Sequence, residues 1–107
     1  MPKYLWNVSY GADGVQGLLK EGGSARRDVA RQLIESLGGR MEAFYFTFGI
    51  RDAIVIADLP DTVSAVAMSL AVSASGSVAF KTTLLITPAE IDQAAKKRVG
   101  YRRPGGN

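Results

Sequence analysis

The chain has 107 residues and a net charge of +3, with 47% apolar and 21% charged residues. Those proportions are typical of one small globular domain and argue against a disordered chain. Cysteine and histidine are both absent, which excludes disulfides, thiolate chemistry, Cys/His zinc sites and imidazole acid–base catalysis. An enzyme built from this sequence would have to use carboxylates, lysine or tyrosine. The composition leaves open whether the chain is an enzyme.

The start of the chain and its longest apolar runs favour a cytoplasmic protein. The opening residues, MPKY, are not a basic leader followed by an apolar stretch, so we expect no signal peptide. No apolar run approaches the length of a membrane span. The sequence assigns no cofactor and no metal site.

The first half of the chain predicts a strand, two helices and a second strand. Residues 3–10 alternate aromatic or β-branched side chains with others, as a strand with two unequal faces does. Apolar spacing then becomes helical; a Gly-Gly pair at 22–23 divides it into a short helix and a longer one, for which we expect Ser24 to be the N-cap. Gly38 and Gly39 end the longer helix, and residues 41–48 form the second strand.

The second half predicts a hairpin partner, a helix, a strand and a terminal helix. Residues 53–58 are apolar until Asp58. Asp61 is the expected cap of the following helix, which Gly76 ends and on which one apolar stripe is expected to comprise Val63, Val66, Ala67, Leu70 and Ala74. Residues 78–86 form the fourth strand. The run TPAE at 87–90 is a capping box with proline at the first helical position.

The resulting order, β-α-β-β-α-β plus a terminal helix, predicts an α+β, ferredoxin-like fold with an antiparallel four-stranded sheet and helices on one face. We expect a single domain over residues 1–100 and a flexible basic tail over 101–107. The third strand is apolar on both faces, yet the helices cover only one of them. Two copies packed sheet against sheet, as a homodimer or a larger assembly, would cover the other; exposure of a small Ala/Val surface is the alternative.

Several polar residues on the expected sheet are candidates for ligand binding. Asp52 and Asp58 bracket the third strand roughly 20 Å apart, too far for one catalytic pair; turn stabilisation and loop capping are their structural alternatives. Lys81 interrupts the fourth strand and either lines a pocket or protects the sheet edge. Asn7 and Tyr45 are expected on the face opposite the helices, with Tyr45 roughly 14 Å from Lys81.

Basic residues form two groups. Arg26, Arg27 and Arg31 follow the Gly-Gly pair on one helix and are candidates for anion binding at a helix start, although a solvated helix face is the simpler interpretation. The second group lies near the C-terminus, at Lys96, Lys97, Arg98, Arg102 and Arg103. Such a tail either binds an anionic partner such as nucleic acid or is simply solvated, and the absence of a motif favours the latter.

Several stretches spread over nearly the whole chain carry a resemblance to a known family: residues 2–5 (PKYL), 19–23 (LKEGG), 25–27 (ARR), 35–39 (ESLGG), 42–46 (EAFYF), 58–61 (DLPD), 81–85 (KTTLL) and 87–88 (TP). On them the sequence resembles the GYD-domain family of small bacterial proteins. The resemblance implies a dimeric α+β barrel fold and carries over no activity. Of the family's glycine, tyrosine and aspartate motif, Gly49 and Asp52 are present, whereas Arg51 stands where the tyrosine is expected.

Three classes of function are compatible with the sequence. The first is a homo-oligomeric protein that binds a small ligand, or catalyses a cofactor-free reaction, in a pocket between the sheet and its partner. The second is a regulatory or assembly module whose sheet face serves only association. The third is an RNA-binding module, which the absence of aromatic residues from the third strand disfavours.

Overall fold

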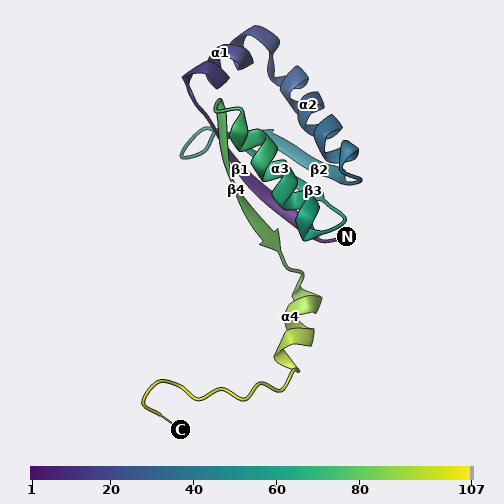
Figure 1. Ribbon diagram of the computed structural model, residues 1–107, viewed down its shortest axis with the longest axis vertical. Helices are drawn as coiled ribbons and strands as arrows, with labels where there is room; N and C mark the ends of the chain where they lie inside the picture. The colour runs from purple at the N-terminus through teal and green to yellow at the C-terminus, as the bar shows by residue number, and fades with distance from the viewer. Residues whose placement is uncertain (107) are drawn as a thin grey trace.

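A computed structural model describes residues 1–106 and contains one four-stranded antiparallel sheet with the strand order β2-β3-β1-β4. The fold is α+β and ferredoxin-like, with two helices between the first two strands and a further helix after the fourth strand (Figure 1). The central strands are β1 and β3, as the topology expected from the sequence requires. The elements in chain order are β1 (Lys3–Tyr10), α1 (Ala12–Glu21), α2 (Gly23–Ser36), β2 (Arg40–Phe46), β3 (Ala53–Asp58), α3 (Thr62–Ala74), β4 (Val78–Leu85) and α4 (Pro88–Ala95).

Most of the predicted helix ends are confirmed. Asp61 accepts a hydrogen bond from the Ser64 backbone at 2.8 Å and caps α3. Thr87 and Glu90 form the capping box of α4. The expected N-cap of α2 is wrong: Gly22 occupies that position, and Ser24 lies inside the helix. Gly22 has φ of +89°, which a glycine adopts without strain, so the chain turns from α1 into α2 before it reaches the serine.

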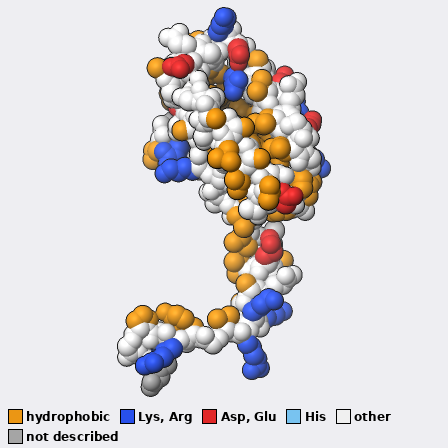
Figure 2. All heavy atoms as spheres, viewed as in Figure 1, with side chains coloured by type: hydrophobic (Ala, Val, Ile, Leu, Met, Phe, Trp, Pro, Cys, Tyr) orange, Lys and Arg blue, Asp and Glu red, His pale blue; other side chains and the backbone are white. Residues whose placement is uncertain are grey.

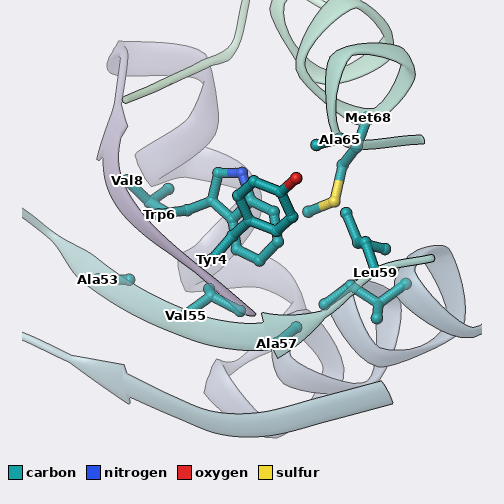
Figure 3. Close-up of a cluster of buried hydrophobic side chains, with 10 residues drawn as sticks. Tyr4, Trp6, Val8, Ala53, Val55, Ala57, Leu59, Ala65 and Met68 are labelled. Carbon is teal, nitrogen blue, oxygen red and sulfur yellow. The ribbon is translucent and has the colours of Figure 1, made fainter. Parts of the chain in front are cut away.

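The core lies between the sheet and the helices α2 and α3. The alternation of β1 is reflected directly in burial, because every second residue from Tyr4 to Val8 is buried. On β3, the alternate residues Ala53, Val55 and Ala57 are buried in the same way. Figure 3 shows these side chains beneath Ala65 and Met68 of α3. The buried set is Tyr4, Trp6, Val8, Ile34, Ala53, Val55, Ala57, Leu59, Ala65 and Met68.

The apolar stripe expected on α3 faces away from the sheet. Val63, Val66 and Leu70 are 77%, 50% and 67% exposed, and Ala67 and Ala74 are exposed as well. Ala65 and Met68 pack onto the sheet instead. Because α3 is apolar almost all round, its periodicity does not determine which face is buried. Figure 2 shows apolar side chains gathered over this helix.

The C-terminal segment extends away from the body of the fold (Figure 1). Residues 88 to 105 are all exposed. The radius of gyration is 17.4 Å and the extents are 60 × 31 × 24 Å, whereas a compact chain of this length has a radius of about 13 Å. Between residues 1 and 106, no helix combines the length and apolar character needed to span a membrane.

Candidate functional site

The sheet face opposite the helices carries three of the residues proposed from the sequence. Tyr45 pairs with Ile54, Ile54 with Asn7, and Asn7 with Lys81, so these four positions form one row across the sheet. Asn7 and Lys81 are direct neighbours, whereas Tyr45 and Lys81 are separated by three strand spacings, roughly 14 Å. The register therefore keeps Tyr45 and Lys81 apart within one chain, as the sequence predicts.

The next row on this face is largely apolar. Ala43 pairs with Ile56, Ile56 with Leu5, and Leu5 with Thr83. Leu5, Ile54 and Ile56 are half-buried by their neighbours in the sheet. The helices α2 and α3 lie on the opposite face (Figure 1). This surface, comprising Leu5, Ala43, Tyr45, Ile54 and Ile56, is called the back face below.

Asp52 and Asp58 lie at opposite ends of β3 and engage different partners. The Asp52 carboxylate accepts a hydrogen bond from the Tyr10 backbone at 2.7 Å. Asp58 lies 3.0 Å from the Lys3 ammonium, which also contacts Glu42 at 2.7 Å. Hydrogen bonds from Lys3 to Glu42 and then Asp58 raise the pKa of Lys3 above its ordinary value. Both aspartates thus have structural partners in the described residues.

Gly49, Arg51 and Asp52, which the resemblance assigns to the glycine, tyrosine and aspartate motif, lie in the loop between β2 and β3. The Thr47 backbone donates to the Asp52 carbonyl at 2.9 Å, and the Thr47 hydroxyl donates to the Arg51 carbonyl. Gly49 lies at the tip, where an added Cβ would contact nothing within 4 Å. The loop tip presents Phe48 and Ile50 to solvent.

The three arginines of α2 are not gathered at one site. Arg27 and Arg31 each contact the Asp28 carboxylate at 3.3 Å on the outer surface of the helix. Arg26 lies 3.5 Å from Glu21 and has a side chain only 30% exposed. Arg27 lines a small pocket with Phe44 and Phe46; of the three arginines, only Arg26 lines the cavity that α2, α3 and the sheet form together.

That cavity has a volume of about 340 Å³ and lies on the front of the sheet, between α2 and α3. This volume falls within the range of small-molecule sites. Its floor consists of β-strand residues and its walls of helix residues, nearly all of them apolar. The lining residues are Trp6, Val8, Tyr10, Arg26, Val29, Ala30, Leu33, Phe44, Val55, Met68, Ala71, Val72, Ser75, Val78 and Phe80.

Trp6 brings an unpaired polar group, its indole N–H, into this lining. The side chain is 1% exposed, and its indole Nε1 finds no hydrogen-bond acceptor among the described residues. A buried donor without an acceptor costs about 1–3 kcal/mol, and a buried tryptophan N–H ordinarily has a partner. Met68 of α3 extends toward the rings of Tyr4 and Trp6 (Figure 3). Its unbranched side chain is the lining group that adapts most readily to a new neighbour.

The front cavity was missed at the sequence level because its walls are ordinary core residues. Val8, Val55 and Phe80 come from three separate strands and meet helix residues that are far away in the chain. One feature of the sequence indicates this site. The single tryptophan of the chain lies in the middle of a strand, and the other inward-facing side chains of that strand offer its N–H no acceptor. Sequence reasoning instead placed the pocket on the back face.

The comparison with protein families gives one match: the GYD domain, over residues 4–95. Apart from Lys3 at the start of β1, the matched region includes all four strands, and it includes the whole of α4. Neither the comparison with curated proteins nor that with solved structures gave a match.

Proposed function

We propose that this chain, which belongs to the GYD domain family, binds a small apolar ligand bearing a hydrogen-bond acceptor in the front cavity. Family membership assigns no chemistry, so the proposal rests on the cavity itself. The observation that carries it is the buried Trp6 Nε1, a donor without an acceptor in an otherwise apolar lining.

The chemistry of the lining selects the ligand. Apolar walls favour an apolar body, at roughly 25 cal/mol per Å² of surface removed from water. An acceptor oxygen that reaches Trp6 Nε1 removes the cost of the unpaired donor, which a hydrocarbon of the same shape leaves in place. Since the indole is almost fully buried, binding requires a small movement of its neighbours, of which Met68 is the most flexible.

The test uses matched ligands that differ in one atom. A phenyl ketone and the alkene of the same shape, acetophenone and α-methylstyrene, are titrated while the fluorescence of the single tryptophan and the melting temperature are followed. We expect Trp6→Phe to weaken binding of the ketone relative to binding of the alkene, with binding of that variant followed by melting temperature alone; the change in the affinity ratio isolates the hydrogen bond, because the alkene is the more hydrophobic of the two. An affinity ratio that Trp6→Phe leaves unchanged, or no binding of either compound, contradicts the proposal.

We also propose that the chain self-associates through its back face, which would confer the assembly role considered above. The row of Ala43, Ile56, Leu5 and Thr83 gives a largely apolar strip across all four strands of the sheet. A closed two-fold pairing buries the same strip twice, which is why dimers of this kind are common. Lys81 and Tyr45, separated within one chain, would face the partner's back face in such a dimer.

The extended α4 supports self-association independently. The family match reaches Ala95, so α4 belongs to the family's domain and is not an appended tail. Its eight residues, including Ile91, are all exposed. An isolated helix this short is marginal in water even with a capping box. A second copy of the chain would supply a surface against which α4 could pack.

Sedimentation equilibrium of paired variants tests the association. Ile56→Glu puts a charge in the centre of the back face and is expected to give a monomer. Val63→Glu puts the same charge on the exposed outer face of α3 and is the matched control, which is expected to remain associated. A native chain that sediments as a monomer at high concentration refutes the association; a dimer that survives Ile56→Glu refutes the back face as its interface.

A further inference from the structure

Arg26 gives the front cavity a charged end. Of the described residues that line the cavity, Arg26 alone carries a charge. It also lines a second, smaller cavity of about 260 Å³, with which the first shares Tyr10, Ser75 and Val78. Arg26 therefore borders both an apolar chamber and a polar one.

Two of the four polar side chains around the apolar chamber can only donate hydrogen bonds, whereas the Tyr10 and Ser75 hydroxyls can also accept them. The Trp6 indole and the Arg26 guanidinium can only donate. The Ser75 hydroxyl already donates to the Val72 carbonyl at 2.7 Å. No carboxylate lines this chamber among the described residues; Asp13 and Glu21 line only the smaller cavity. A ligand that pairs with Trp6 and Arg26 must therefore bring acceptors, and the strongest acceptor for a guanidinium is a carboxylate.

Arg26 is available for such a ligand. Its contact with Glu21 spans 3.5 Å, which is long for an ion pair, and the Glu21 side chain is 48% exposed. Exposed pairs of this kind contribute little to stability. The guanidinium has five N–H groups, so it can bind a carboxylate on the chamber side while keeping or releasing Glu21 on the other.

Resting on the proposed function, we infer that the ligand is an amphipathic carboxylic acid. Its apolar body fills the chamber beneath α2 and α3, and its carboxylate pairs with Arg26, which borders both cavities. Asp13 and Glu21 repel a second negative charge beyond the guanidinium, so the class is a monoacid and not a diacid. The other two arginines of α2 take no part, since both are paired with Asp28 outside the cavity.

Decanoate and 1-decanol form the probe pair, because they share the apolar chain and differ in the charge at its end. Affinities are measured from tryptophan fluorescence below the concentration at which either probe aggregates. A charge-assisted hydrogen bond to Arg26 predicts roughly tenfold tighter binding of the acid. Arg26→Met is expected to abolish this preference. Glu21→Gln is expected to increase it, because the variant frees the guanidinium.

Arg31→Met is the matched control, with the same loss of charge on the same helix away from the cavity. It is expected to keep the preference for the acid. Decanol binding without preference for decanoate, or equal loss of preference in both arginine variants, overturns this inference and leaves the proposed function standing. If neither probe binds, the inference is overturned, because the cavity then takes no chain-like ligand. The titration with the ketone and the alkene tests the proposed function separately.

Discussion

Trp6 of β1 and Val55 of β3 lie directly opposite each other in the register of the sheet, and both side chains line the floor of the front cavity. Val55 is 4% exposed and apolar throughout, so it offers nothing to the indole N–H. The two central strands thus bring the one unpaired buried side-chain donor of the described chain to an apolar hollow between sheet and helices. Substitutions in the helix residues that line the cavity can therefore test ligand binding without changing Trp6.

Filling the cavity from the helix side separates ligand binding from folding. Ala30→Leu adds apolar volume from α2 into the hollow, and we expect it to raise the free energy of unfolding by up to about 1 kcal/mol while abolishing ketone binding. Ala74→Leu, on the exposed outer face of α3, is the control and is expected to leave binding unchanged. Chemical denaturation and fluorescence titration measure the two effects. Ketone binding that persists in Ala30→Leu places the ligand elsewhere.

Gly39 is required where the chain leaves α2 and enters β2. A Cβ at this position would overlap the Asp58 carbonyl oxygen and lie 2.7 Å from Leu59 Cδ2. The backbone cannot yield easily there, so Gly39→Ala is expected to lower the free energy of unfolding by about 2–3 kcal/mol.

Gly17 provides the contrast for that substitution. It lies in the interior of α1, and an added Cβ would contact nothing within 4 Å. Gly17→Ala is therefore expected to stabilise the chain by about 0.5–1 kcal/mol. Urea denaturation of both variants measures the two changes, and a similar change in both would mean that the close approach at Gly39 does not exist.

The Lys3 cluster predicts an alkaline limit to stability. The pKa of Lys3 is raised from 10.5 by its hydrogen bonds to Glu42 and Asp58. A group whose pKa is higher in the folded state than in the unfolded state stabilises the fold fully when the pH is below its unfolded-state pKa. This contribution is lost as the pH rises through its folded-state pKa. Lys3→Met is expected to melt below the native chain at pH 7, with the difference disappearing as the pH rises through the raised pKa of Lys3 in the folded state.

Lys20→Met is the control for the pH series, since Lys20 is exposed at the end of α1. Its melting temperature is expected to follow that of the native chain at every pH. A gap between Lys3→Met and the native chain that stays constant into the alkaline range contradicts the assignment of the ion pairs as its source.

The sequence predicts the local features of this fold well and its packing less well. The capping groups Asp61 and Thr87 mark helix starts because they satisfy backbone N–H groups within a few residues. The orientation of α3 does not follow from the sequence, because an almost uniformly apolar helix carries no local record of which face meets the sheet.

The candidate sites also differ in whether local sequence patterns or side-chain packing determine them. Strand alternation places Asn7 and Tyr45 on the face opposite the helices, and the register of the sheet puts them there in one row with Lys81. The front cavity depends on how residues from α2, α3 and the strands fit together, and no periodicity in the sequence records that fit. Arg26 was identified as an anion-binding candidate together with Arg27 and Arg31, but only side-chain packing distinguishes it from them.

The most direct test of the cavity is the indole resonance of Trp6. The chain has one tryptophan, so a ¹⁵N-labelled sample gives one indole N–H signal in a two-dimensional NMR spectrum. On addition of acetophenone, a new hydrogen bond at Nε1 is expected to move this signal downfield, whereas α-methylstyrene is expected to leave its proton shift nearly unchanged. An indole signal that responds identically to both compounds, or to neither at saturating concentration, contradicts the account.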